Sequence, residues 1–327
     1  MTGISAGATL VAVVLIASAG LSIWDLQTAQ KRTLVVYTTP ALRDVLEKFV
    51  VPQFENRTGT TIALVYVAAG QQYNRLRMAG DHSEADLFLH ASPLYEEQGY
   101  SEGHVDAVFI PQDASLPDEF KSRSVEGGRI WYAFAWSPLV EVYAPRLGSP
   151  PDIGTTDLKV GFAHPLLSNN GVYAALALEN VSAAAGEHAL AQTRVQPVNA
   201  RANIGGVADG NFDVTMGYEA VTLYYRGQGA NVAYDVPLIM GQRVTTPVLC
   251  SVALIHGDSH PQAKQLLSFL FEDATQDALH EYFFRPTLPG HPPVEGSIDV
   301  TGTTSLSFDW SEWSAIKDLL SKYEVRS

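Results

Sequence analysis

Small polar residues and glycines recur in short turns along the chain, where they could bind a small solute. Hydroxyl and amide side chains at such turns can hydrogen-bond a ligand, and exposed backbone N–H groups suit an oxyanion. The candidates are Thr38, Thr39, Gly70, Ser92, Ser168, Asn169, Asn170, Gly171, Asn203, Tyr218 and Glu219. The same hydroxyl and amide groups can cap helices, and one residue can both cap a helix and bind a ligand. We expect a small-solute site here, with an oxyanion or organophosphorus anion as the favoured ligand.

Two histidines suggest a second chemistry, the binding of a metal ion. His90 and His164 each follow a predicted strand, and Tyr218 and Glu219 could complete a set of nitrogen and oxygen ligands. Imidazole and carboxylate ligands suit transition metals. Each histidine could instead hydrogen-bond a loop carbonyl, so the metal site is the alternative hypothesis.

Catalytic motifs are missing from the sequence. It contains no CxxC, HExxH or Cys/His zinc spacing, no GxSxG turn, no Walker phosphate loop and no dinucleotide glycine fingerprint. The single cysteine, Cys250, lies in the apolar run VLCSV and is expected in the core. The sequence therefore predicts a protein that is not an enzyme and needs no cofactor, with a hydrolase as the disfavoured alternative.

Length and charge narrow the class of protein further. A chain of 327 residues is long for a single core and suits two lobes of roughly 100–150 residues. It has 35 acidic and 21 basic residues, a formal net charge of −14. Nucleic acid is excluded as a partner, because no basic stripe is present to displace counterions from phosphates.

The first 30 residues are typical of an export signal. Residues 1–24 carry no charged side chain, residues 8–23 are almost entirely apolar, and Ala17-Ser18-Ala19 offers a cleavage site. No basic residue precedes the apolar run, whereas Lys31-Arg32 follow it. Residues 1–30 are therefore predicted to be either a signal peptide or an uncleaved membrane anchor, with the rest of the chain in the periplasm or at the cell surface.

Predicted strands and helices alternate after this segment. Residues 33–37, 61–67 and 85–89 read as strands, and each is followed by a helical pattern. A second series begins at Lys159 and includes a helix near residues 170–179 and a strand at 213–216. This alternation predicts an α/β fold with mostly parallel sheets covered on both faces.

Two long extended segments, residues 131–143 and 244–255, are expected to carry the chain between two lobes. They divide it into a discontinuous lobe 1 (33–137 plus 251–295), a lobe 2 (138–250) and a C-terminal tail with a helix (296–327). A pair of crossing strands can bend as a hinge. The strand ends of the two lobes, which carry the candidate residues, would then face each other.

Several motifs, in this order, resemble those of type 2 periplasmic solute-binding proteins. The similar segments are residues 33–41, 54–62 (FENRTGTTI), 85–92 (ADLFLHAS), 205–218, 259–270 and 284–287 (FRPT, with Phe in place of the usual Tyr). Together they span nearly the whole chain after the signal. The resemblance implies two mixed, mostly parallel sheets joined by a two-strand hinge.

The resemblance also implies a function. The chain is similar to the branch that contains ferric-ion and phosphonate binders of ATP-binding-cassette (ABC) importers, which implies a monomer that hands a small solute or ion to a membrane permease. Tyr224-Tyr225 is similar to the tyrosine pair of ferric binders but falls several residues late, with Glu219-Ala220 at the expected place. An anchored ligand-sensing receptor is an alternative of another class.

Overall fold

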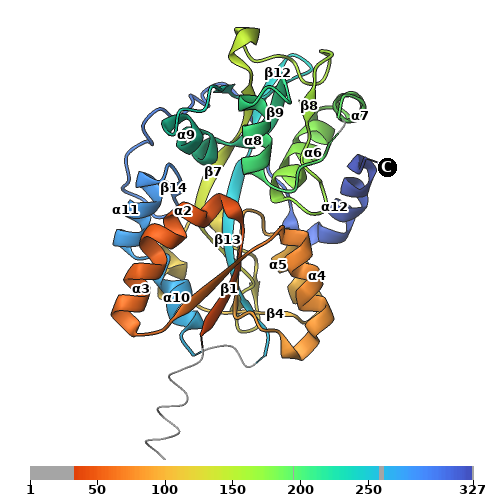
Figure 1. Ribbon diagram of the computed structural model, residues 1–327. Coiled ribbons are helices and arrows are strands. Elements are labelled where there is room, and N and C mark those ends of the chain that lie inside the picture. Colours follow the sequence, from red (N-terminus) through yellow and green to blue (C-terminus); the bar gives the residue numbers. More distant parts are fainter. Residues whose placement is uncertain (1–32, 194, 258–260, 326–327) are drawn as a thin grey trace, which may run out of the picture.

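The computed structural model describes residues 33–193, 195–257 and 261–325. Its main sheet runs through both halves of the molecule, which lie one above the other in Figure 1. The order of its principal strands is β2 (Ile62–Tyr66), β1 (Leu34–Thr38), β3 (Leu87–His90), β13 (Pro247–Ile255), β7 (Tyr132–Tyr143), β9 (Val214–Tyr218) and β8 (Val160–Gly161). The first three strands are parallel, and β13 joins them antiparallel. The prediction of an α/β fold is confirmed.

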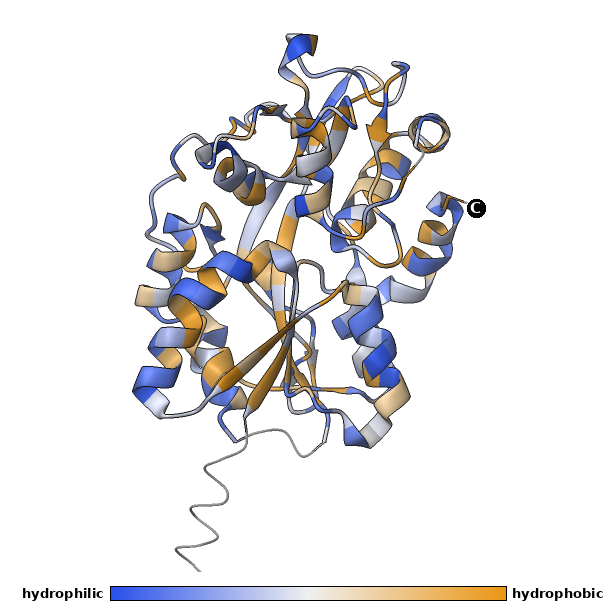
Figure 2. Cartoon of the chain, in the orientation of Figure 1, coloured by the Kyte–Doolittle hydropathy of each residue, from blue (hydrophilic) through white to orange (hydrophobic). Residues whose placement is uncertain are grey.

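Helices cover the sheet in both halves (Figure 1). The lower half contains α2 (Arg43–Val45), α3 (Val51–Thr58), α4 (Ala69–Ala79), α5 (Leu94–Ser101), α10 (Ala263–Phe269) and α11 (Asp273–Glu281). The upper half contains α6 (Asn169–Val181), α7 (Ala183–Ala191), α8 (Ala200–Ala208) and α9 (Glu219–Gly227). In Figure 2 the strands of the lower half are mainly hydrophobic, whereas the outer helices alternate between hydrophobic and hydrophilic residues. Each helix therefore buries one face against the sheet.

The helix after β1 contains a π-helical turn. A short 3-10 turn, η1 (Pro40–Leu42), leads into α2, and a π segment, η2 (Leu46–Val50), joins α2 to α3. The backbone N–H of Val51 donates to Leu46 O, five residues earlier. Pro52 has no N–H, and its ring excludes the normal bond to the carbonyl four residues before it. The proline explains why the helix widens here rather than ending.

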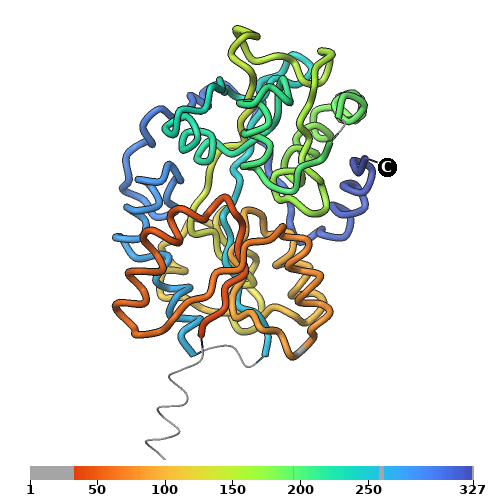
Figure 3. The backbone as a smooth tube through the Cα atoms, viewed as in Figure 1, coloured from red at the N-terminus to blue at the C-terminus, as the bar shows by residue number. Residues whose placement is uncertain are grey.

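Strands β7 and β13 pass from one half of the molecule to the other (Figure 3). The first part of β7 pairs with β13 and with β14 (Arg285–Pro286), and the second part pairs with β9 and β10 (Ala233–Asp235). The extended segment predicted at 244–255 is divided at Thr246 into β12 (Gln242–Thr245) and β13. We keep the predicted division of the chain to name the lobes below: lobe 1 is 33–137 with 251–295, and lobe 2 is 138–250.

The C-terminal residues 296–325 form a strap that contacts both lobes and ends at the right of Figure 1. Strand β15 (Thr304–Ser305) pairs in parallel with β12 of lobe 2. Helix α12 (Trp313–Leu320) packs against α5 of lobe 1 and α6 of lobe 2. Lys317 Nζ donates to Gln98 Oε1 of lobe 1 at 3.0 Å, and Tyr323 OH donates to Glu179 of lobe 2. The predicted terminal helix at 309–323 is α-helical over α12, with 3-10 turns at both ends.

The predicted signal or anchor, residues 1–30, lies outside the described residues. None of the helices in the described part of the chain is both long and apolar enough to cross a membrane.

Candidate functional site

The predicted site residues of lobe 1 lie where its strands end. Thr38 is the last residue of β1 and fully buried, and Thr39 precedes the 3-10 turn η1 without a side-chain cap. Ser92 follows β3, and its Oγ accepts a hydrogen bond from Leu94 N at 3.3 Å. Gly70 was predicted in a loop, but it belongs to the first turn of α4, because the helix begins one residue earlier at Ala69. All four residues lie on the edge that faces lobe 2.

The predicted site residues of lobe 2 lie mainly around the start of α6. Ser168 precedes the helix, and its carbonyl, rather than its hydroxyl, begins the helical hydrogen bonding by accepting from Val172 N at 3.1 Å. Asn169 and Asn170 are buried in the first turn. A β-carbon at Gly171 would lie 2.5 Å from the carbonyl oxygens of Ala163 and His164, so only glycine lets this turn approach that backbone.

Asn203 lies in a helix, whereas Tyr218 lies at the end of a strand. Asn203 was predicted at the end of a strand, but it lies inside α8 and is fully buried. Tyr218 does end β9, as predicted, and burial raises the pKa of its hydroxyl well above the usual value. Helix α8 reaches the lobe interface because it packs against η1, directly after Thr38 and Thr39.

The two lobes touch each other at these edges. Gly70 N donates to Leu167 O at 3.3 Å, and Tyr95 OH donates to Leu166 O. These contacts join the start of α4 and α5 in lobe 1 to the turn before α6 in lobe 2. The structure is therefore a closed arrangement of the lobes, in which the candidate residues are shielded from solvent.

Several buried polar atoms of the predicted residues lack a hydrogen-bond partner within the described ranges. They include Thr38 Oγ1, both amide atoms of Asn169, Asn170 Oδ1 and both amide atoms of Asn203, and also His90 Nδ1, which lies near the equally unpaired Glu96 Oε2. Buried polar groups are nearly always paired, because an unpaired group loses its hydrogen bonds to water without replacement. Four of the predicted binding residues thus have free hydrogen-bonding capacity at the lobe interface, which is what a polar ligand requires.

Two further residues with the same property were missed by the sequence analysis. The hydroxyl of Tyr66, at the end of β2, and Nε of Arg201, in α8, are buried without a partner in the described part of the chain. Burial and the neighbouring Glu47 carboxylate raise the pKa of Tyr66, whereas the nearby charges of Arg43 and Arg201 act in the opposite direction. The strand-end argument that selected Thr38 applies equally to Tyr66, but nothing local distinguishes Arg201 from a surface arginine.

Asp44 of lobe 1 links Arg201 to a polar cluster across the interface. Its carboxylate accepts hydrogen bonds from Arg201 Nη2 and from Tyr224 OH at 2.8 Å, both in lobe 2, and from Lys48 Nζ at 3.0 Å. Burial alone would raise the pKa of Asp44, but these three donors outweigh it and lower the pKa to about 2. Tyr224, considered above for iron, is therefore engaged with Asp44. A cavity of about 10 Å³, room for about one water molecule, lies beside this cluster.

We expect Asp44→Asn to shift the protein without ligand toward an open form by roughly tenfold, because the charged partner of Arg201 is lost. Small-angle scattering should show a larger radius of gyration for this variant than for the parent. The ligand-free parent should open further in acid. Its ionised Asp44 favours closure above about pH 4, and this contribution is lost as the pH falls through about 2. Asp118→Asn, whose side chain is 99% exposed, is the matched control. Identical scattering curves for the Asp44 variant and the parent would contradict the assignment.

The structure does not bring together the residues that were predicted as an alternative metal site. His90 is fully buried, with Nε2 2.5 Å from Gln72 Oε1 and Nδ1 3.7 Å from Glu96 Oε1. His164 Nδ1 accepts from Leu166 N at 3.2 Å, and its Nε2 faces Glu324 at 3.5 Å. Among the residues that can be described, no three His, Cys, Asp or Glu side chains are grouped to hold a metal ion. The predicted grouping of His90 and His164 with Tyr218 and Glu219 is therefore not found among these residues, whose nearest polar neighbours are Gln72 and Glu96 for His90, Glu324 for His164 and Arg285 for Glu219.

Glu219 in particular supports the fold and does not face a ligand. Its fully buried carboxylate accepts from Arg285 Nη2 at 2.8 Å and Nε at 3.2 Å, and from Ile298 N at 2.6 Å. Arg285 also stacks over the ring of Trp136 at 4.8 Å. Glu219 therefore ties lobe 2 to the returning chain of lobe 1 and to the strap, and both of its carboxylate oxygens accept hydrogen bonds from the protein.

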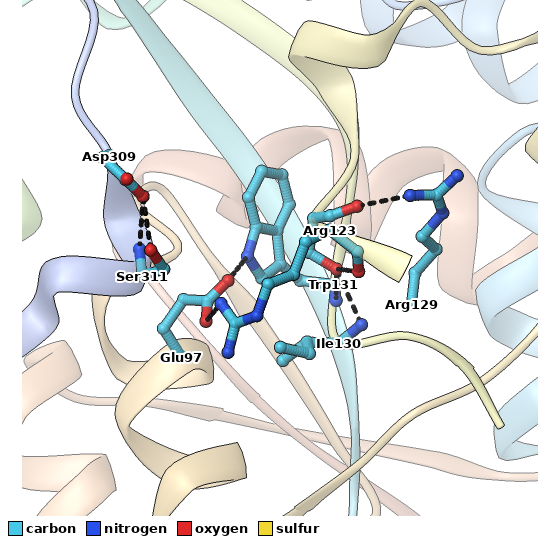
Figure 4. Close-up of polar contacts among 8 residues, drawn as sticks. Glu97, Arg123, Arg129, Ile130, Trp131, Asp309 and Ser311 are labelled. Carbon is cyan, nitrogen blue, oxygen red and sulfur yellow. Dashed lines mark hydrogen bonds and ion pairs between the residues drawn. The ribbon is translucent and has the colours of Figure 1, made fainter. Parts of the chain in front are cut away.

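A separate cavity of about 470 Å³ lies beneath the strap. Figure 4 shows part of its wall, where Trp131 and Glu97 of lobe 1 lie near Asp309 and Ser311 of the strap. Trp131 Nε1 donates to Glu97 Oε1 at 2.8 Å, and Arg123 Nη1 lies 2.6 Å from Glu97 Oε2. The polar groups drawn there are paired with one another, so this cavity differs from the lobe interface, where polar atoms are left unpaired.

Comparisons with known proteins agree with this architecture. The family model of the bacterial extracellular solute-binding proteins matches residues 34–285. No curated protein sequence matches the chain significantly.

Similar solved structures have the same fold. They include the periplasmic binding protein AfuA from Actinobacillus pleuropneumoniae with bound fructose-6-phosphate (TM-score 0.77, 16% identity, 90% of this chain and 98% of that chain). A periplasmic thiamin binding protein is also similar, with a TM-score of 0.73 and 19% identity over 89% of this chain and 95% of that chain. Iron-bound HitA from Pseudomonas aeruginosa has a TM-score of 0.71 and 15% identity over 90% of this chain and 99% of that chain. At these identities the likeness shows the fold alone, and the predicted two-lobed fold is confirmed.

Proposed function

Because the chain belongs to the bacterial extracellular solute-binding proteins, we propose that it captures a small anion between its lobes for a membrane permease of an ABC importer. The predicted family is thereby confirmed, and its members bind solutes outside the cytoplasm. The favoured ligand is an oxyanion or an organophosphorus anion. The permease as partner, the monomeric state and the role as a carrier rather than an enzyme belong to the same proposal.

The observation that supports an anion is the set of buried, unpaired hydrogen-bond donors at the lobe interface. The amide groups of Asn169 and Asn203, the hydroxyl of Thr38 and Nε of Arg201 all lack a partner among the described residues. Neutral donors and one guanidinium can together replace the water that surrounds an anion. A cation would instead require a group of carboxylates or imidazoles. Glu219 is paired with Arg285, and no three His, Cys, Asp or Glu side chains of the described residues are grouped to hold a metal ion.

Capture requires the lobes to separate and close again. β7 and β13 connect them, and the direct contacts between the strand-end edges include polar ones, such as Gly70 with Leu167 and Asp44 with Arg201. Bending of two strands would expose the unpaired atoms to solvent, and closure over an anion would satisfy them. The importer can then distinguish the loaded from the empty protein by its closed shape.

Thermal unfolding in the presence of candidate solutes tests the proposal. We expect an anion among phosphate, molybdate, phosphonates and phosphate esters to raise the melting temperature, since about 100 times the Kd adds roughly 2.7 kcal/mol. Asn169→Ala should abolish most of this shift. Asn74→Ala, on the exposed face of α4, should not. Ferric ion, zinc and thiamine complete the panel. Stabilisation by one of these three alone, with none from any anion, would overturn the anion assignment.

A further inference from the structure

We infer that the solute is an organic anion that also carries hydroxyl or amino groups, and not a bare oxyanion. This inference rests on the proposed function and narrows its ligand class. It follows from the kinds of unpaired atoms at the interface, which include acceptors as well as donors.

Three amide oxygens at the interface can only accept hydrogen bonds. Asn170 Nδ2 donates to Met216 O at 2.8 Å, which sets the orientation of this amide and leaves Oδ1 as an unpaired acceptor. Asn169 and Asn203 each have both amide atoms unpaired, so each offers one donor and one acceptor whichever way the amide is turned. The site thus presents three buried acceptors that need donors from the ligand.

A bare oxyanion cannot meet this requirement. Fully ionised sulfate or molybdate has acceptor oxygens only, so it would leave all three amide oxygens buried and unsatisfied. Inorganic phosphate at neutral pH carries at most two protons, so it can donate to at most two of the three amide oxygens. A hydroxyl or ammonium group on an organic ligand would donate to the amide oxygens, while the anionic group accepts from the donors. Sites that hydrogen-bond a substrate hydroxyl reject analogues without it by large factors.

The anionic end of the ligand is expected near Arg201 and Tyr66. Arg43, Lys48 and Arg201 surround this corner with Asp44 and Glu47, which leaves a local excess of one positive charge in a chain of net charge −14. Arg43 stacks over the ring of Tyr66 at 4.5 Å. Arg201 Nε is an unpaired donor within the described part of the protein, and the Tyr66 hydroxyl lies beside the Glu47 carboxylate. The hydroxyl groups of a neutral polyol would accept from Nε but would leave the local excess of positive charge without a counter-charge, so we expect a ligand that carries both an anionic group and hydroxyl or amino groups.

Titration calorimetry with three groups of probes tests the inference at pH 7.5. The groups are bare oxyanions (phosphate, sulfate, molybdate), hydroxylated or aminated anions (glycerol 3-phosphate, glucose 6-phosphate, gluconate, 2-aminoethylphosphonate) and neutral polyols (glycerol, glucose). We expect a member of the second group to bind at least about 100-fold more tightly than any member of the other two. A bare oxyanion that binds as tightly would overturn the inference but leave the proposed anion carrier intact. A neutral polyol that binds as tightly, or no binding by any anion, would overturn both.

A variant tests the role of the acceptors directly. Asn203→Leu keeps the side-chain size but removes one donor and one acceptor. The preference for the hydroxylated anion over inorganic phosphate should therefore fall at least tenfold. Asn74→Leu, on the exposed face of α4, should leave the preference unchanged. An unchanged preference in the Asn203 variant would overturn the role of that amide. If the variant does not fold, the probe series on the parent protein still decides the inference.

Discussion

Replacing Gly70 by alanine should hold the lobes apart and weaken solute binding by at least tenfold. A β-carbon at Gly70 would collide with the carbonyl oxygen of Leu166 and lie 2.8 Å from Tyr95 OH and 3.2 Å from Leu167 Cα. Leu166 and Leu167 belong to lobe 2, so the collision with their backbone exists only when the lobes are closed, whereas Tyr95 OH is the end of a lobe 1 side chain that can move aside. Each lobe should fold normally, because Gly70 lies in the first turn of α4, where alanine is a good helix former.

Scattering and calorimetry on the same samples would measure this effect. The Gly70→Ala protein should keep a larger radius of gyration with ligand than the parent, and its melting temperature without ligand should change little. Gly205→Ala is a matched control, since a β-carbon there meets no atom within 4 Å and Gly205 also lies in a helix. Full closure and parental affinity in the Gly70 variant would refute the closed arrangement of the lobes as the binding form.

Glu219→Ala should lower the free energy of unfolding by about 3–5 kcal/mol, the loss typical of breaking a buried ion pair from one side. The substitution removes both hydrogen bonds to the Arg285 guanidinium and the acceptor of Ile298 N. Arg285 would then remain largely buried without its counter-charge, since its side chain is only 19% exposed. Urea or thermal unfolding measures the loss.

Measuring the solute affinity of Glu219 variants distinguishes a structural role of this residue from a ligand-binding role. The folded fraction of Glu219→Ala should bind with nearly the parental Kd, because the carboxylate faces Arg285 and the strap. Glu219→Gln should be milder, since it still accepts from Ile298 N. Glu187→Ala removes an exposed carboxylate in α7 and should change stability by less than about 0.5 kcal/mol. A large loss of affinity without loss of stability would restore Glu219 to the ligand site.

The strand ends of lobe 1 were predictable from the sequence. The apolar runs at 33–37, 61–67 and 85–89 and the helical spacing after them depend on neighbours along the chain, so they predict β1, β2 and β3 to within two residues. The parallel order of these strands then places Thr38, Gly70 and Ser92 on one edge. The motifs in their order along the chain also identified the family.

Partners distant in sequence could not be predicted in the same way. Asp44 meets Arg201, Gly70 meets Leu167, and Glu219 meets Arg285, across separations that no local pattern records. His90 and Glu219 had the right chemistry for a metal, but the packing gave each another partner, Gln72 for one and Arg285 for the other.

The sequence by itself therefore determined the α/β elements, the two crossing segments and the edge at which polar residues gather. Only the tertiary structure decided which of those residues keep a free hydrogen-bonding group and which are consumed by the fold. The physical reason is that strand and helix formation depends on periodicity over a few residues. The pairing of a buried polar atom depends instead on which distant group the sheet register and the closure of the lobes bring within about 3 Å.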